Sequence, residues 1–433
     1  MDRDEAEDYV YASYMRAEPH LDRDAPDSEK RDPSLTRDVL RSLSGTPSVI
    51  VTGSKGKGSV AYMISEILRG RYRTGLMTGP HITRFNERIG IDGECIGDDD
   101  LVRCTERVRG LFDPIESVLP EDRYISPVGI QAAIACMYFR DMGTEYNIFE
   151  CGKGARYDDV PNILHDYTII NTVFAEHTRE LGGTVEAIAD DKSYAVTGSE
   201  RCVFIAEQEP SVMEVLLKRT ASLGVRTMVY GRDFRASDIR YSDEGMTFDV
   251  TVGGRIFNDI TIPLLGEHQA RNFALAAAVC LEIDDTLNIG SMTDLSWPGR
   301  LELLRKGPTV ILDACINRRS CADILQVVRR MCSMRPNTVV CIPDDKDYIG
   351  VCTEMSKISE RMILTSSGDP HYRFTSGQIE VLKEHGIEAE WYDSPYDAVS
   401  GSFDGERPVI LLGTTSFISR VKTARMTDII MQR

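Results

Sequence analysis

The sequence predicts an α/β protein of two domains: a larger one with a central, mainly parallel sheet and a smaller C-terminal one of the Rossmann-like α/β type. Three observations predict this fold class. With 433 residues, the chain is long enough for two or three domains with their own cores. Apolar strand patterns alternate with helical patterns along most of it. Between two such series, Ser-Trp-Pro-Gly-Arg at 296–300 contains the proline and glycine that break regular structure, so we expect domains at 1–298, with a short N-terminal extension, and at 299–433.

The first domain is expected to be built around a glycine-rich stretch. An apolar strand pattern at Val49–Val51 leads into a turn, and a helical pattern follows from Val60 to Arg69. Glycines let the backbone N–H groups of such a turn point at phosphate oxygens, and the helix adds its positive N-terminal end. A lysine can then reach the outer phosphates and a serine hydroxyl can bind Mg²⁺. The expected phosphate-binding residues are Gly53, Ser54, Lys55, Gly56, Lys57, Gly58 and Ser59. The stretch therefore predicts a P-loop ATPase domain, although Gly58 separates the lysine from the serine, which are usually adjacent.

Further polar residues follow the expected strands of this domain. Glu150 ends the strand pattern 146–150, and His177 follows the pattern Tyr167–Val173. Parallel strands deliver such residues to the edge that also carries the phosphate loop. At this edge the carboxylate of Glu150 could bind Mg²⁺. The alternative interpretation is that Glu150 simply ends its strand and faces solvent. By itself Lys192, in the helical run 185–194, reads as a solvated lysine.

The other expected elements of the first domain are mostly short. His81 should follow a strand that ends near Thr78, and Asn272, near the start of a helix from His268 to Cys280, can offer an adenine both a donor and an acceptor. Residues 200–265 are expected to form short strands and turns. We also expect helices at 6–16, 34–43 and 129–140, a short strand pair at 91–95 and a hairpin at 248–252 and 255–260.

The C-terminal domain shows a second alternating series. Strands are expected at 309–313, 338–342, 361–365, near 390 and at 408–412, with helices at 321–331 and 376–385. Such alternation predicts a mainly parallel sheet.

Composition limits the partners. The net charge of −18 argues against nucleic acid or an anionic membrane as the main partner. The eleven cysteines are scattered without a C-x-x-C pair, which favours a reducing compartment. No stretch approaches the roughly 20 apolar residues that a membrane-spanning helix needs. We expect a cytoplasmic monomer that acts on small molecules.

Many short motifs, in order, give the chain a family resemblance. Residues 52–59 resemble TGTNGKGS, 78–81 with 86–89 resemble TSPH and NERI, 150–158 resemble EVGLGGRLD, 176–182 resemble DHTxxLG, 188–192 resemble IAxEK, 266–272 resemble GxHQxxN, 297–300 match WPGR, and 344–347 resemble ADKD. On these motifs the chain resembles the Mur ligase superfamily and, within it, the branch of folylpolyglutamate and dihydrofolate synthases.

The resemblance implies ATP-dependent amide formation. A substrate carboxylate would take the γ-phosphate of MgATP to give an acyl phosphate, and an amine would then displace the phosphate. The resemblance assigns Lys57 and the loop amides to the phosphates, Ser59 and Glu150 to a first Mg²⁺, and His177 to a second. It makes Lys192 a carbamylated lysine. It also assigns Asn272 to adenine, Arg300 to the phosphates, Asp313 to the ribose, and Pro80, His81 and Arg88 to the substrate.

Three departures bear on the substrate. Gly79 stands where the family has a metal-binding serine, Ile316 replaces the histidine of DGAHNP, and residues 126–131 lack the FExxT segment that borders the folate pocket. The leading hypothesis is a ligase that adds an amino acid, glutamate first, to a folate- or pterin-type carboxylate. The alternatives are a Mur-type ligase for a cell-envelope or other cofactor precursor, and an ATP-binding protein without turnover.

Overall fold

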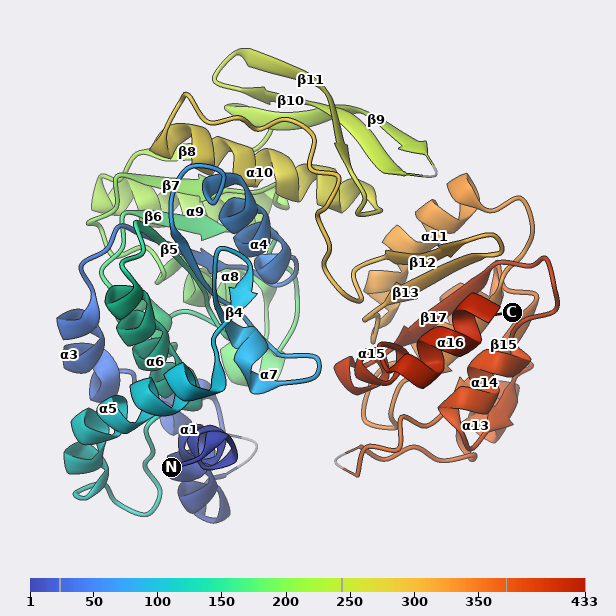
Figure 1. Ribbon diagram of the computed structural model, residues 1–433, viewed down its shortest axis with the longest axis horizontal. Helices are drawn as coiled ribbons and strands as arrows, with labels where there is room; N and C mark the ends of the chain where they lie inside the picture. Colours follow the sequence, from blue (N-terminus) through green and yellow to red (C-terminus); the bar gives the residue numbers. More distant parts are fainter. Residues whose placement is uncertain (23–24, 243, 371, 433) are drawn as a thin grey trace. The chain divides into compact units, whose positions relative to one another are not determined.

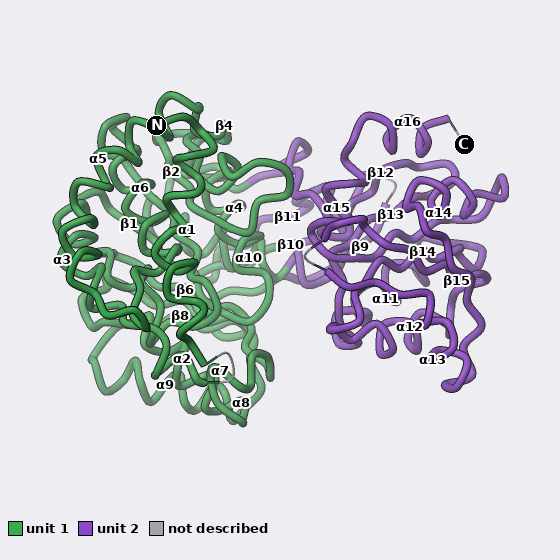
Figure 2. Tube along the Cα trace, turned by 90° about the horizontal axis from the view of Figure 1, so that it is seen from below, with its two compact units in different colours: residues 1–235, 250–256, 271–289 green, residues 236–249, 257–270, 290–433 purple. Residues whose placement is uncertain are grey.

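The computed structural model describes residues 1–22, 25–242, 244–370 and 372–432. They form two compact units, which Figure 2 colours separately. Unit 1 comprises residues 1–235, 250–256 and 271–289, and unit 2 comprises residues 236–249, 257–270 and 290–433. Because segments between residues 236 and 289 alternate between the two units, a single domain boundary at residue 298 stays a prediction.

Unit 1 contains an eight-stranded sheet. Its strands are β1 Ser48–Thr52, β2 Thr74–Met77, β3 Ile89–Ile91, β4 Glu94–Cys95, β5 Tyr146–Glu150, β6 Tyr167–Ile170, β7 Cys202–Ile205 and β8 Thr227–Val229. They lie in the order β4-β3-β2-β5-β1-β6-β7-β8, and only β3 and β4 are antiparallel to their neighbours. The expected mainly parallel sheet is confirmed. The order of strands along the chain reverses at β1, and ligands of open α/β sheets bind beyond the carboxyl ends of strands at such a point.

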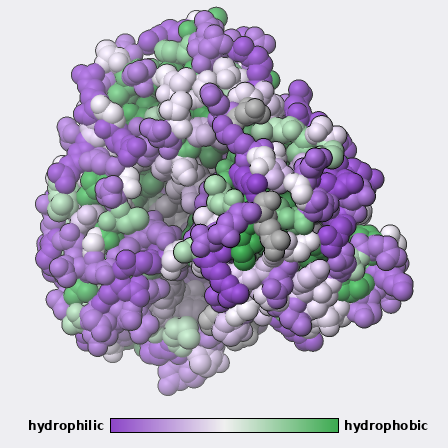
Figure 3. All heavy atoms as spheres, turned by 45° about the vertical axis from the view of Figure 1, so that its right-hand side comes forward, coloured by the Kyte–Doolittle hydropathy of each residue, from purple (hydrophilic) through white to green (hydrophobic). Residues whose placement is uncertain are grey.

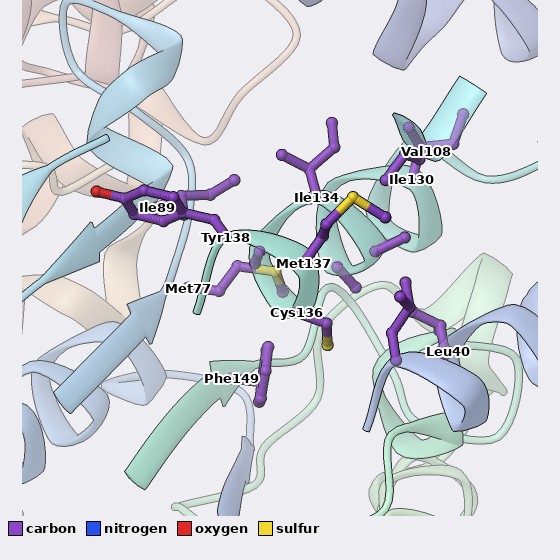
Figure 4. Packing of buried hydrophobic residues seen from close by; sticks show 14 of the residues in the cluster. Leu40, Met77, Ile89, Val108, Ile130, Ile134, Cys136, Met137, Tyr138 and Phe149 are labelled. Atoms are coloured by element: carbon purple, nitrogen blue, oxygen red, sulfur yellow. The ribbon is translucent and has the colours of Figure 1, made fainter. Parts of the chain in front are cut away.

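Several helices of unit 1 lie around this sheet, some on its faces and others on those helices (Figure 1). They are α1 Arg3–Ala17, α2 Asp27–Lys30, α3 Ser34–Leu43, α4 Lys57–Leu68, α5 Asp98–Glu116, α6 Pro127–Met142, α7 Thr178–Leu181, α8 Val185–Ser193 and α9 Pro210–Leu223. Helices α1, α3 and α5 all pack against α6. In Figure 4 the side chain of Cys136 of α6 lies between Leu40 of α3 and Phe149 of β5, and Ile130 lies beside Val108 of α5. Burying each such side chain contributes about 1.5–3 kcal/mol, so this cluster holds the N-terminal helices on the sheet.

Two long helices were not expected from the sequence. Helix α9 lies within residues 200–265, where short strands and turns were expected, so that expectation was wrong there. Its signals are nevertheless ordinary: Pro210 at the first helical position, Val212 and Leu216 buried one turn apart, and Gly224 at the C-terminus with φ of 67°. Helix α5 likewise buries Leu101, Cys104, Thr105, Val108 and Phe112 at helical spacing. Packing of these apolar stripes stabilises both helices.

A three-stranded sheet and one helix continue the chain. The strands are β9 Phe234–Ser242, β10 Gly245–Val252 and β11 Arg255–Ile262, in the order β11-β10-β9, and helix α10 spans Glu267–Ile283. Strands β10 and β11 are joined by Gly253 and Gly254, whose φ angles of 56° and 82° suit a two-residue hairpin turn. The expected hairpin and helix are therefore confirmed, each a few residues longer than predicted.

Unit 2 contains a six-stranded sheet in the order β12-β13-β17-β14-β15-β16. The strands are β12 Glu302–Lys306, β13 Thr309–Asp313, β14 Asn337–Cys341, β15 Arg361–Thr365, β16 Glu390–Tyr392 and β17 Val409–Gly413. All are parallel except β12, which confirms the expected α/β arrangement. The helices are α11 Cys321–Met331, α12 Tyr348–Ser356, α13 Gln378–Glu384, α14 Pro395–Gly401, α15 Thr415–Val421 and α16 Ala424–Gln432.

A buried hydrogen-bonded pair, His165 and Glu200, lies where β6 and β7 of unit 1 begin. The Nε2 atom of His165 is 3.1 Å from a carboxylate oxygen of Glu200, and its Nδ1 atom is 2.7 Å from the carbonyl oxygen of Ile163. The same Nε2 atom also lies 3.1 Å from the hydroxyl of Thr168 and 3.2 Å from the carbonyl oxygen of Ala195. Glu200 also accepts from the backbone N–H groups of Thr197 and Gly198 at 2.6 and 2.8 Å. This pair lies at the amino ends of the strands, away from the phosphate loop.

The described surface is mainly polar. Figure 3 shows one face, on which hydrophilic residues predominate and hydrophobic atoms form only small patches. No helix among the described residues is long and apolar enough to cross a membrane. All eleven cysteines are free thiols.

Candidate active site

The phosphate loop joins β1 to α4 in a conformation that only glycine adopts easily. Gly53 has a φ of 137°, and Gly56 has a φ of 78° directly before the helix. A Cβ atom at Gly56 would lie 2.6 Å from the side-chain nitrogen of Asn171, and one at Gly53 would lie 2.9 Å from the Cβ of Asn171. The helix begins at Lys57, three residues earlier than predicted. Its unpaired N-terminal N–H groups therefore face the loop, as in an anion-binding site.

The side chains of the loop are held from within and from the segment after β6. The Lys57 Nζ donates to the carbonyl oxygen of Gly53 at 3.1 Å. The Ser54 N–H donates to the carbonyl oxygen of Thr172 at 2.9 Å, and the N–H of Phe174 donates to the Ser54 hydroxyl at 3.1 Å. Ser59 is buried in the first turn of α4. The loop is thus pre-formed, with Lys57 folded back over it.

Glu150 lies beside the loop because β5 pairs with β1 in register. Val51 is directly opposite Glu150 in this parallel pair, so Glu150 lies level with a residue two positions before Gly53 of the loop. One carboxylate oxygen accepts from the N–H of Gly79 at 3.2 Å and from the hydroxyl of Thr78. Both donors follow β2, so the ends of three neighbouring strands meet here.

The oxygen donors of Ser59 and Glu150 fit a magnesium ion. Mg²⁺ prefers oxygen ligands and is typically held by one or two carboxylates together with substrate phosphates. Among the described residues, no three or more His, Cys, Asp and Glu side chains are grouped to hold a metal ion. An ion at this position would therefore depend on the nucleotide for several of its ligands.

Lys192 is buried against the phosphate loop. Its side chain has no solvent-exposed area, and its Nζ donates to the carbonyl oxygens of Lys153 at 2.6 Å and Gly53 at 3.0 Å. It also pairs with Glu176 at 3.2 Å. Burial is the largest cause that lowers the pKa of Lys192, followed by the nearby Lys57, whereas Glu176 raises it. The plain interpretation of a solvated lysine was therefore wrong, because α8 turns this residue toward the sheet.

His177 follows β6 at a strained backbone position. Its φ of 45° lies in the left-handed region, and it precedes the short helix α7. His177 is exposed, but desolvation of its imidazole is the largest cause that lowers its pKa; Glu176 and Glu180 raise it. A neutral imidazole is the form that binds a metal. Strand β6 ends at Ile170, so His177 lies in a longer loop than the sequence predicted.

A hydrogen-bonded chain leads from Glu150 to the predicted substrate residues. Gln131 of α6 donates to the carbonyl oxygen of Thr78 at 3.3 Å and accepts from Arg88 at 3.1 Å. The Arg88 Nε donates to Nδ1 of His81 at 2.9 Å, which places the ring hydrogen of His81 on Nε2. Burial, and then Arg88, lower the pKa of His81. Pro80 lies exposed between these groups.

Gln131 and Asn171 were not predicted as site residues. Gln131 is a buried polar residue in the otherwise apolar helix α6, which was a usable signal. The Asn171 side chain donates to the Asn272 side chain at 3.1 Å, and both side chains lie close to Gly56. Asn272 is therefore beside the phosphate loop, as expected for a nucleotide-binding residue.

Two predicted site residues belong to unit 2. The carboxylate of Asp313, at the end of β13, accepts from the N–H of Leu301 at 2.8 Å. The Arg300 guanidinium donates to the carbonyl oxygen of Gly299 at 3.2 Å, and the N–H of Ala314 donates to the same oxygen at 2.8 Å. Arg300 and Asp313 are thus held together by the backbone within that unit.

A pre-formed phosphate loop at the reversal point of a parallel sheet defines unit 1 as a P-loop domain. The family model for the Mur ligase middle domain matches residues 51–280, and the chain belongs to this family. It is accordingly an enzyme of the ligase class.

Curated relatives and solved structures agree with this family. The chain is 29% identical over 386 residues to a dihydrofolate synthase/folylpolyglutamate synthase of Mycobacterium tuberculosis, covering 83% of this chain and 79% of that protein. It is 26% identical over 383 residues to a folylpolyglutamate synthase of Lacticaseibacillus casei, covering 86% and 88%. The structure of the Mycobacterium tuberculosis folylpolyglutamate synthase complexed with ADP has a TM-score of 0.82 at 25% identity, covering 96% of this chain and 99% of that one.

Proposed function

We propose that this chain is an ATP-dependent ligase that adds glutamate to a folate- or pterin-type carboxylate through an acyl phosphate. The observation that carries the proposal is the register of β1 and β5, which brings Glu150 to the phosphate loop. The similarity to relatives named dihydrofolate synthase/folylpolyglutamate synthase supports the choice of acceptor and amino acid. The similarity to a neighbour complexed with ADP supports the nucleotide.

In this proposal the loop binds the phosphates of ATP. The Lys57 ammonium and the N–H groups at the start of α4 offset negative charge as the γ-phosphate is transferred. Asn272, beside Gly56, is a proposed adenine contact. Arg300 and Asp313 remain predicted contacts to the phosphates and the ribose. Mg²⁺ would supply further charge neutralisation when bound, with Ser59 and Glu150 as its proposed protein ligands.

The proposed reaction needs no protein nucleophile. The acceptor carboxylate attacks the γ-phosphorus, the bond to the ADP oxygen breaks, and an acyl phosphate forms. The amine of glutamate then attacks the acyl carbon, and inorganic phosphate leaves with its bonding electron pair. The contribution of the protein is positioning and charge neutralisation. Arg88, His81 and Pro80 are the residues that we propose for the acceptor, because Arg88 brings a cation toward Gly79 and Glu150.

The second Mg²⁺ ion that the resemblance implies has fewer ligands in this chain. Gly79 has no side chain to offer, and its N–H is already bonded to Glu150. His177 remains the proposed protein ligand of that ion. We also propose that the protein works as a cytoplasmic monomer on small molecules; the eleven free thiols fit a reducing compartment.

A second candidate function is a Mur-type ligase with a different acceptor. It is favoured by Gly129, where an added Cβ would lie 2.6 Å from Thr36 and 3.0 Å from Asp159, so this part of the expected folate border holds no larger side chain. The third candidate function is binding of ATP without turnover. It is favoured by Gly79 and Ile316, which replace a serine and a histidine of the family motifs.

Phosphate release with panels of acceptors and amines tests the proposal. We expect release only when ATP, Mg²⁺, a dihydropteroate or folate acceptor and glutamate are all present. Release only with other carboxylates would favour the second candidate. ATP binding without release for any pair in the panel would contradict the proposed ligation.

The state of Lys192 can be tested separately. Among the described residues its Nζ contacts three acceptors, one of them the Glu176 carboxylate, which suits an unmodified lysine with its donors in use, although burial and the nearby Lys57 lower its pKa. A carbamate would retain one N–H and bring a second anion against Glu176. We therefore expect no carbamate carbon signal in NMR spectra of protein equilibrated with ¹³C-labelled bicarbonate. A labelled signal that disappears in Lys192→Arg would instead support the modification that the resemblance implies.

A further inference from the structure

A buried cluster of charged residues surrounds Arg31, between α2 and α3. The guanidinium lies 3.9 Å from a carboxylate oxygen of Asp27, 3.8 Å from one of Asp158 and 3.5 Å from one of Asp159. It also donates to the hydroxyl of Ser126 at 3.2 Å. The side chain of Arg31 is 10% exposed, and those of the three aspartates are 3% exposed or less. One cation thus joins an N-terminal segment to the residues just before η3, the short helix Val160–Asn162.

The second cation of the cluster is Lys153. Its Nζ donates to Asp27 at 3.0 Å and lies 3.6 Å from Glu180 of α7. Buried carboxylates are costly unless they are paired. Without Arg31, Asp158 and Asp159 would lose their shared cation, and Asp27 would retain Lys153 alone. The position of Lys153 therefore depends on the charge balance around Arg31.

The cluster is connected to the phosphate loop through backbone atoms. Asp27 holds the side chain of Lys153, whose carbonyl oxygen accepts from Lys192 at 2.6 Å. Lys192 in turn donates to the carbonyl oxygen of Gly53 at 3.0 Å. Asp158 accepts from the N–H of Gly152 at 2.9 Å, so the segment 152–158 is held at both ends.

We infer that Arg31 is a positioning residue of the nucleotide site: with Asp27 it fixes the segment 152–158, and through Lys153 and Lys192 it fixes the phosphate loop. The family motif does not imply this connection, because this chain has Lys153 where the similar motif EVGLGGRLD has leucine. The inference deepens the proposed function and rests on it for the identity of the nucleotide. It adds a site determinant that lies in the N-terminal extension, outside the matched residues 51–280.

Three variants of the full chain test the inference. Asp27→Asn keeps the shape and removes the charge that holds Lys153, and Arg31→Met removes the shared cation. Arg16→Met is the matched control, because Arg16 also ties the N-terminal segment down, to Glu116 at 2.7 Å and to the carbonyl oxygen of Arg123 at 2.7 Å, without reaching Lys153. The readouts are the Kd of a non-hydrolysable ATP analogue with Mg²⁺ and the amide hydrogen exchange of residues 53–59 without nucleotide.

We expect the Kd to rise roughly tenfold in Asp27→Asn and up to about a hundredfold in Arg31→Met, as for other residues that orient binding groups. Exchange in residues 53–59 should become faster in both variants, and Arg16→Met should change neither readout. If Arg31→Met does not fold, the Kd and hydrogen exchange of Asp27→Asn alone test the inference. The inference would be overturned if a folded Asp27→Asn or Arg31→Met protein kept the wild-type Kd and exchange rates. It would also be overturned if Arg16→Met showed the same changes as these two variants. If the wild type binds no ATP analogue, the proposed function fails, while hydrogen exchange still tests the connection.

Discussion

Replacing Glu150 by Gln is expected to lower the ligation rate on the order of a thousandfold at saturating ATP and Mg²⁺. The carboxylate oxygen that accepts from Thr78 and Gly79 has a counterpart in the amide oxygen of glutamine, so the fold should be retained. What is lost is the negative charge that we propose for holding Mg²⁺ beside the phosphate loop. Phosphate release measured against Mg²⁺ concentration gives both the rate and the apparent metal affinity.

Glu145 offers a matched control for this experiment. It is exposed just before β5 and accepts from the backbone N–H of Arg73 at 2.9 Å, far along the strand from the phosphate loop. Glu145→Gln should leave the ligation rate and its Mg²⁺ dependence unchanged. A Glu150→Gln enzyme with the wild-type rate and Mg²⁺ dependence would rule out the proposed metal ligand.

Replacing Glu200 by Gln is expected to lower the free energy of unfolding by about 1–3 kcal/mol at pH 7, because the buried carboxylate that bonds to His165 and to the N–H groups of Thr197 and Gly198 is lost. Urea unfolding followed by far-UV circular dichroism measures the change in the free energy of unfolding. The double variant His165→Gln/Glu200→Gln should lose less than the sum of the two single variants, because the two side chains share one contact. Losses that add up fully would contradict a coupling between His165 and Glu200.

The same pair gives the wild type a pH dependence. Burial tends to raise the pKa of Glu200, but hydrogen bonds from His165 and the Thr197 backbone outweigh it and lower the pKa from 4.5 to about 2. A carboxyl whose pKa is lower in the folded state stabilises the fold above its unfolded pKa. This contribution, about 3 kcal/mol, is lost as the pH falls from about 4.5 toward 2. The stability difference between wild type and Glu200→Gln should therefore shrink between pH 5 and pH 3, whereas the exposed Glu214→Gln variant should follow the wild type.

Local patterns were sufficient for much of the fold. Strands β5, β13 and β15 and helices α3 and α11 have the predicted bounds, because each combines one apolar face or run with clear end signals. The family motifs, which lie mostly at the carboxyl ends of strands, also supported the ligase class. Helices α5 and α9 were missed although their apolar stripes are regular.

The candidate site was less accessible to local reasoning. A pattern of residue types can place Lys192 on a helix, but only packing decides that this helix face is buried against Gly53. Gln131 and Asn171 connect elements far apart in the sequence, so their partners could not be read from spacing. The same applies to Arg31, because two of its partners, Asp158 and Asp159, lie far from it along the chain.

The sequence by itself determined the phosphate loop, since its glycines, its lysine and the flanking strand and helix are local properties of residues 49–69. It also determined which acid, histidine and lysine accompany the loop. Only the tertiary structure decided how these groups are held: Glu150 by the ends of three strands, and Lys192 by Gly53, Lys153 and Glu176. The physical reason is that burial and charge pairing are properties of neighbours in space, which the order of residues along one chain does not specify.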